Sequence, residues 1–209
     1  MKRIFLLFLV FVTAVTLKAQ FIKNYGVKFG IATSQQFTRF HIPENTIGLI
    51  VTSGPVNSLQ GMTIGVNTEF MDYPPFNLVF EGNYIQKGYS YEWTEDWTGV
   101  NKTYIEKFRF HYLNFLLLTK TKIVYEKISP YILAGPRLDI EIAYEDSRYA
   151  EYNNKFIPGF VVGIGSEIAL YNIKFLAEVI YDFNFGKIHE DTYETVSYQS
   201  YVFRLGILL

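Results

Sequence analysis

The chain has 209 residues, a formal net charge of −1 and no cysteine. The lack of cysteine excludes a disulfide framework and a lipoprotein anchor, and the slightly acidic balance argues against nucleic acid as a partner. Aromatic residues make up 18% of the chain, with 17 tyrosines and 19 phenylalanines. That excess fits the aromatic girdles of membrane β-barrels.

The N-terminus has the pattern of a secretory signal. A basic pair, Lys2 and Arg3, precedes an apolar stretch, and Ala19-Gln20 offers a cleavage site after either residue. The stretch is shorter than the roughly 20 residues of a membrane-spanning helix. We expect residues 1–19 to be a signal peptide and 20–209 one exported domain. That domain has 16 basic and 20 acidic residues, hence a net charge of −4.

The rest of the chain consists of runs in which apolar and polar residues alternate, as in half-buried strands. Long polar segments and short turns separate these runs in alternation, which is typical of antiparallel outer-membrane barrels. The expected strands lie near residues 25–32, 61–71, 77–93, 106–119, 128–144, 157–170, 173–185 and 202–209. Long connections are expected at 34–60, 94–104, 145–155 and 186–197, and short ones at 72–75, 120–126 and 171–172.

The last run reaches the final residue. Phe203, Leu205, Ile207 and Leu209 form an apolar face opposite one that carries Arg204. An apolar open edge aggregates in water, whereas a closed barrel has no edge and its apolar face can meet lipid. The same four residues are the expected signature for insertion by the barrel-assembly machinery. The sequence therefore predicts an all-β fold, an eight-stranded antiparallel transmembrane up-and-down β-barrel in the lipid of the bacterial outer membrane.

A soluble barrel with an apolar interior, as in lipocalins, has the same periodicity. Three features favour lipid on the outside: large aromatic apolar faces, small residues such as Gly163 and Gly165 on the charged faces, and alternating long and short connections. We expect these glycines to relieve crowding around long inward side chains.

Two strands carry irregular patterns. Arg109 and His111 are expected to point inward, yet they share their parity with Leu113 and Phe115, which are expected to point outward. A bulge would reconcile the two expectations. Pro136 in the middle of the 128–144 strand suggests a second bulge, because proline cannot donate to the sheet.

The charged faces define a candidate interior. An eight-stranded barrel is only wide enough for side chains to fill, so buried charges must pair with one another. We favour a structural ion-pair core over a proton path or a small pore. The expected inward set is Lys28, Glu69, Glu81, Lys87, Arg109, Arg137, Asp139, Glu141, Glu167, Glu178, Asp182 and Arg204.

Signals for catalysis or metal binding are weak. His41, His111 and His189 are too far apart in sequence to suggest a metal site. Ser197 and Asp191 lie near His189, but nearness within a loop does not define a catalytic triad. We expect no enzymatic activity, cofactor or metal. Acidic residues lie beside aromatic ones in the long connections, which could bind a partner, a cation or a sugar, although a solvated surface is the interpretation we prefer.

Three segments resemble PorT-like outer-membrane barrel proteins of Bacteroidetes. Residues 84–89 (YIQKGY) resemble that family's Y-x-QKG strand, 112–118 (YLNFLLL) its YLEIPLLLK strand, and 130–136 (PYILAGP) its PYLxAGP strand. Two departures stand out. Asn114 and Phe115 replace the family's Glu and Ile-Pro, and the chain ends in Leu209 where such barrels commonly end in an aromatic residue.

The resemblance implies a barrel fold and, because the founding member is implicated in secretion of surface proteins, an envelope or secretion partner. The first hypothesis is therefore a closed, non-catalytic barrel with a structural, adhesive or secretion-accessory role. A small passive porin is the alternative. An envelope hydrolase with His189 as its base is a third hypothesis.

Overall fold

The structure, a computed structural model, describes residues 22–40, 56–73, 76–97, 100–124, 127–145, 155–185, 189–190 and 194–209. The expected signal peptide and its cleavage site lie outside these residues. Within them, no helix is long and apolar enough to cross a membrane.

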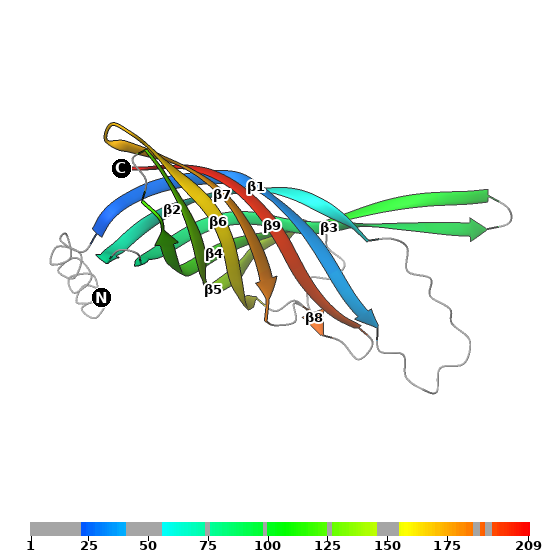
Figure 1. Ribbon diagram of the computed structural model, residues 1–209. Helices are drawn as coiled ribbons and strands as arrows, with labels where there is room; N and C mark the ends of the chain where they lie inside the picture. The colour runs from blue at the N-terminus through cyan, green and yellow to red at the C-terminus, as the bar shows by residue number, and fades with distance from the viewer. Residues whose placement is uncertain are drawn as a thin grey trace, which may run out of the picture.

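The described strands form one antiparallel sheet in which neighbours in sequence are neighbours in space, and β1 pairs with β9 to close the sheet (Figure 1). β8 is a two-residue strand on the edge of β9, so eight strands make the wall. The predicted eight-stranded antiparallel barrel is confirmed. Its strands are β1 (Ile22–Phe40), β2 (Val56–Tyr73), β3 (Phe76–Trp97), β4 (Val100–Lys122), β5 (Ile128–Glu145), β6 (Phe156–Leu170), β7 (Ile173–Asn184), β8 (His189–Glu190) and β9 (Glu194–Leu208).

The two ends of the barrel differ in their connections. At one end, which we call the turn end, the strands are joined across residues 74–75, 123–127 and 171–172. Leu170 pairs with Ile173 there, so Tyr171 and Asn172 form the expected tight turn. Tyr171 has a positive φ of 55°, a left-handed conformation that glycine adopts more readily than tyrosine. The opposite end, the loop end, has connections at 41–55 and 146–154.

Several strands run further toward the loop end than the sequence predicts. The expected connection at 94–104 is instead a continuous hairpin, with Trp97 paired to Val100. Within the described residues, 92–97 and 100–105 pair with each other and with no second strand, because pairing of β2 with β3 starts at Tyr91 and that of β4 with β5 stops at Arg109. This two-stranded ribbon projects past the other strands (Figure 1). The side chains of residues 103–105 on this ribbon are exposed, whereas hydrophobic periodicity detects strands with one buried or lipid-facing side.

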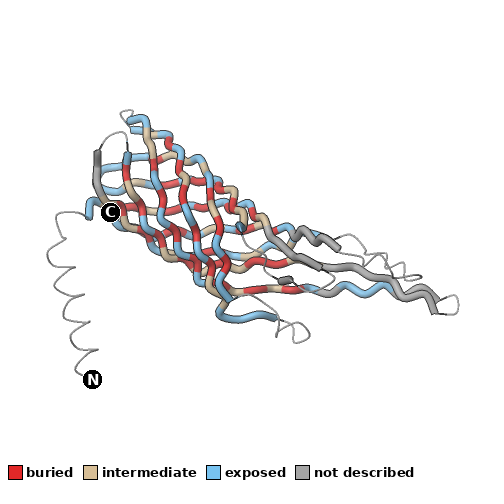
Figure 2. The backbone as a smooth tube through the Cα atoms, turned by 90° about the horizontal axis from the view of Figure 1, so that it is seen from below, coloured by how far each residue is buried: buried red, intermediate tan, exposed pale blue. Residues whose placement is uncertain are grey.

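The two faces of the wall are opposite in character. Buried and exposed residues alternate along every strand of the wall (Figure 2). The outward side carries large apolar residues, among them Phe29 and Ile64, which are 56% and 58% exposed. The inward side holds charged residues such as Lys28 and Glu81, which are 4% and 1% exposed. A soluble barrel would reverse this arrangement, so the wall is built to face lipid.

The expectations for the two irregular strands were wrong. β4 keeps one parity from Phe108 to Lys120, so Arg109 and His111 lie on the outward side with Leu113. The register shift is on β5, where Glu141 and Ala143 face the consecutive residues Tyr112 and His111. No shift occurs at Pro136: the register of β5 with β6 is continuous there, and β4 simply makes no bridge between Leu116 and Thr119. The missing proline N–H is thus tolerated by a local gap in pairing.

Candidate functional site in the barrel interior

Four charged residues form a closed ring near the middle of the interior, which we call the central ring. Lys28 Nζ donates to Glu81 Oε1 at 2.6 Å and to Glu178 Oε1 at 2.8 Å. Arg204 completes the ring, with Nη1 2.6 Å from Glu81 Oε2 and Nη2 2.6 Å from Glu178 Oε2. Each cation touches both carboxylates and each carboxylate touches both cations. All four side chains are at most 4% exposed.

A second ring of the same design, the loop-end ring, contains Lys87, Arg137, Asp139 and Asp182. Lys87 Nζ lies 2.8 Å from Asp139 Oδ2 and 2.5 Å from Asp182 Oδ2. Arg137 pairs with Asp139 and, through Nε, with Asp182 Oδ1 at 2.7 Å. Asn114 donates to Asp139 Oδ1 at 2.5 Å.

A third group, the turn-end cluster, contains Glu69, Lys120, Lys122 and Glu167. Lys120 Nζ lies 2.6 Å from Glu69 Oε1 and also pairs with Glu167. Lys122 lies 3.8 Å from Glu167 Oε2. Each of the three groups has two positive and two negative side chains, so each is formally neutral. This balance offsets the desolvation cost of burying the charges.

Tyr131 connects two of these groups. Its hydroxyl donates to Glu178 Oε1 in the central ring at 2.7 Å. Its ring centroid lies 4.2 Å from Lys120 Nζ of the turn-end cluster, a cation–π distance. Gly165 gives the ring its room, since a Cβ there would lie 2.5 Å from the tyrosine ring. Gly159 does the same for Arg137, whose Nη2 would clash with an added Cβ.

The remaining interior is apolar and packed. Buried side chains line it between and around the charged groups, for example Leu116, Leu133, Val161, Ile180 and Val202. Toward the loop end, Tyr89 stacks on Phe108 with ring centroids 4.8 Å apart. Charged groups and apolar packing together leave the inward side chains of the described wall with little contact to solvent.

The structure places ten of the twelve expected inward charges in these three groups. Arg109 is not among them: its expected inward position is wrong, and it lies on the outward side, where Nη1 contacts Glu145 Oε2 at 3.3 Å. Glu141 lies near the loop end, is only partly buried, and its Oε2 has no hydrogen-bond partner within the described structure.

Sequence reasoning missed Lys120, Lys122 and Tyr131. Lys120 was expected in a turn, but β4 continues to Lys122 and keeps the inward parity of Leu116 and Leu118. The correct alternation along β4 would have predicted that Lys120 points inward. Tyr131 follows from no charge pattern, since its role depends on neighbours from β4 and β7.

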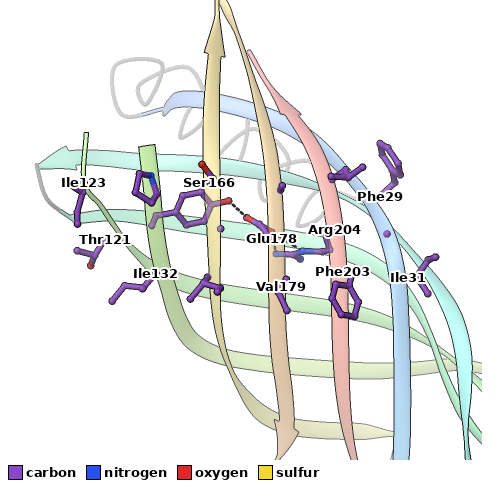
Figure 3. A pocket seen from close by; sticks show the side chains of 17 residues that line it. Phe29, Ile31, Thr121, Ile123, Ile132, Ser166, Glu178, Val179, Phe203 and Arg204 are labelled. Carbon is purple, nitrogen blue, oxygen red and sulfur yellow. Dashed lines mark hydrogen bonds and ion pairs between the residues drawn. The ribbon is translucent and has the colours of Figure 1, made fainter. Parts of the chain in front are cut away.

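Part of the outer wall is hollowed (Figure 3). The hollow has a volume of about 930 Å³, and its lining is mainly outward apolar side chains such as Ile31, Ile132, Val179 and Phe203. Glu178 and Arg204 lie side by side on β7 and β9 behind this region, joined by their ion pair (Figure 3). In a lipid bilayer, hydrocarbon chains would fill a hollow of this kind.

The described residues offer little for catalysis or metal binding. The side chains of His41, His189, Asp191 and Ser197 lie outside them, so the proposed arrangement around His189 is untested. Among the residues that are described, no group of three or more His, Asp or Glu side chains is placed to hold a metal ion.

The expected insertion residues Phe203, Leu205 and Leu209 are exposed on the outward side.

A wall with apolar residues outside and paired charges inside defines a membrane β-barrel. The family described as outer membrane protein beta-barrel domain matches residues 18–190, and the chain belongs to this family. Its location is therefore the bacterial outer membrane. No curated protein sequence matches the chain.

Solved structures agree on the fold. The outer membrane protein OprG from Pseudomonas aeruginosa aligns with 11% identity and a TM-score of 0.54, covering 90% of this chain and 97% of its own. The outer membrane protein AlkL, solved by solid-state NMR in DMPC bilayers, aligns with 12% identity and a TM-score of 0.53, covering 88% of each chain. At such identities the likeness concerns the fold alone.

Proposed function

We propose that this protein is a closed, non-catalytic barrel that holds an external binding surface in the outer membrane and acts as an accessory in secretion or adhesion. Its three segments resembling PorT-like proteins of Bacteroidetes make secretion of surface proteins the first process to examine. The proposal includes export by the N-terminal signal, insertion by the barrel-assembly machinery, and a loop end that faces the cell exterior, as is usual for the longer connections of such barrels.

The observation that carries the proposal is the ribbon beyond the wall. Each arm, residues 92–97 and 100–105, extends about 20 Å at the usual rise of a strand. Along the two outer edges of the ribbon, the described residues form no ladder with a second strand. Such edges accept an extended segment of another protein by strand addition. A two-stranded ribbon is also marginally stable alone, so a partner strand would stabilise it.

The interior supports the closed form of this proposal rather than a pore. Water and ions would have to pass two rings whose charges are paired at 2.5–2.8 Å and whose side chains are almost fully buried. Planar-bilayer recordings of the refolded protein should therefore show no stable conductance. A steady ohmic channel would favour the small porin instead.

Shortening the ribbon tests the role directly. Replacing residues 92–105 by Asn-Gly joins the paired residues Tyr91 and Glu106 through a tight turn and leaves the wall intact. The variant should still refold, seen as a heat-modifiable band on gels. In cells it should fail to restore the secretion or adhesion defect of a deletion strain.

The control shortens a different loop-end connection, residues 41–55, by a similar length. Full complementation by the variant without the ribbon would overturn the proposed role of the ribbon. A deletion strain with normal secretion and adhesion would overturn the proposed function itself.

A further inference from the structure

Five outward residues near the loop end form a polar cluster that the barrel interior does not explain. We call it the rim cluster: Tyr84 and Gln86 on β3, Arg109 and His111 on β4, and Glu145 on β5. Tyr84 Oη lies 2.5 Å from His111 Nδ1 and accepts from Gln86 Nε2 at 3.0 Å. Glu145 reaches two side chains of β4, with His111 Nε2 at 3.4 Å and Arg109 Nη1 at 3.3 Å.

The rim cluster lies where the lipid-facing side of the wall ends. Along β4 the outward residues Leu117, Phe115 and Leu113 are apolar, and the next ones toward the loop end are His111, Arg109 and Lys107. The register shift on β5 brings Glu145 opposite Arg109 on the same outward side. In a membrane, this change from apolar to charged marks the level of the lipid headgroups.

The cations of the rim cluster have bonding capacity left over. Arg109 is about a third exposed, makes one long contact to Glu145, and its Nε is buried with no hydrogen-bond partner in the described structure. Glu145 is 57% exposed, so its pairing with Arg109 contributes little. Lys107 is exposed on the same side. Two permanent cations and a histidine thus face the membrane boundary with one carboxylate between them.

We propose that the rim cluster binds the phosphate group of an outer-leaflet lipid, with Arg109 and Lys107 as its main contacts. The planar guanidinium of arginine suits two oxygens of one phosphate. Tyr84 and Gln86 supply neutral polar groups beside it. Further along β4 toward the turn end, the outward side carries an apolar row, Leu113, Phe115 and Leu117, whose side chains are 37–45% exposed. This row would contact the acyl chains of the same lipid. That row favours a lipid over free phosphate as the source of the ligand.

This proposal rests on one part of the proposed function, that the loop end faces the cell exterior. It does not depend on the ribbon. The variant lacking residues 92–105 keeps Lys107, Arg109 and the rest of the rim cluster, so it should bind lipid as the parent does. The lipid-binding proposal and the proposed function can therefore be refuted independently of each other.

The probe is lipid A, a glycolipid with two phosphate groups, added to the refolded mature protein in detergent micelles and detected as a bound adduct by native mass spectrometry. Arg109→Gln should weaken binding about tenfold, as expected for loss of a charge-assisted pair of hydrogen bonds. Lys107→Gln should weaken binding less. The affinity of Arg109→Lys should fall between those of the parent and Arg109→Gln, because lysine keeps the positive charge but not the paired donors of the guanidinium. Lys127→Gln, which removes an exposed cation at the turn end, is the matched control and should bind normally.

Three results would overturn the proposal. Equal binding by the parent, Arg109→Gln and Lys107→Gln would exclude the rim cluster as the site. An equal loss in Lys127→Gln would show unspecific attraction to cations. Displacement of lipid A by inorganic phosphate at similar concentration would identify a free-phosphate site in place of a lipid site. Heat-modifiable gel migration of each variant verifies folding. If Arg109→Gln does not refold, the binding measured with Lys107→Gln still tests the proposal.

Discussion

Charged residues lie in two regions of this barrel, and their surroundings differ. In the central ring, ion pairs of 2.6–2.8 Å join side chains that are at most 4% exposed. In the rim cluster, Glu145 contacts Arg109 and His111 at 3.3–3.4 Å, and these three side chains are 14–57% exposed. The charged groups of the central ring are paired with one another, whereas the rim charges retain donors for a ligand. The same residue types therefore serve stability in one region and recognition in the other.

The largest effect should come from opening the central ring. Arg204→Leu leaves Glu81 and Glu178 buried with Lys28 as their only shared cation, and loss of one partner of a buried pair costs about 3–5 kcal/mol. Thermal or urea unfolding of the refolded barrel measures this. Leu205→Ile, on the lipid-facing side next to it, is the matched control and should be nearly neutral. Equal stability of the two variants would contradict a structural role for the ring.

A smaller loss should follow from crowding the interior without changing its charge. Gly165→Ala puts a Cβ within 2.5 Å of the Tyr131 ring and would displace this link between two charged groups. Overpacking of this kind costs about 1–3 kcal/mol. Unfolding curves of Gly165→Ala and of Gly165→Ala combined with Tyr131→Leu should differ, with the double variant recovering part of the loss. No recovery would place the strain elsewhere.

The rim should behave in the opposite way. Arg109→Gln should change the free energy of unfolding by no more than about 0.5 kcal/mol, because its partner is exposed and their contact is long. Measuring the unfolding of Arg109→Gln and Arg204→Leu under the same conditions compares the two regions directly. A loss as large as that of Arg204→Leu would show that the rim cluster is structural and would remove the reason to look for its ligand.

The smallest effect concerns the turn between β6 and β7. Tyr171 has a left-handed backbone, which costs a residue with a side chain about 1 kcal/mol relative to glycine. Tyr171→Gly should therefore leave stability unchanged or raise it slightly. The side chain is 97% exposed, so little packing is lost. A marked loss of stability in lipid, absent in detergent, would instead assign this ring to the membrane interface.

The contrast also explains what the sequence could predict. Strict alternation placed the lipid-facing residues and most of the paired charges, because a strand's parity is local information. It failed on β4, where polar residues at the rim share parity with Leu113 and Phe115: Arg109 was expected inside and Lys120 in a turn. Arg109 is outward because β4 keeps one parity past the end of its apolar stretch, and Lys120 points inward because the strand continues to Lys122. The ribbon was missed because residues 94–104 show no apolar alternation, so periodicity did not reveal the pairing of 92–97 with 100–105.

The central claim, charges inside and apolar residues against lipid, is tested most directly on β9. The cysteine-free chain allows single nitroxide labels at the adjacent pairs 200 and 201, and 204 and 205, in refolded protein reconstituted in lipid. Ser200 and Arg204 are buried, whereas Tyr201 and Leu205 are more than half exposed. Labels at 201 and 205 should be accessible to lipid-soluble oxygen, and those at 200 and 204 shielded from it. The reverse pattern would contradict the membrane barrel and indicate a soluble barrel with an apolar cavity.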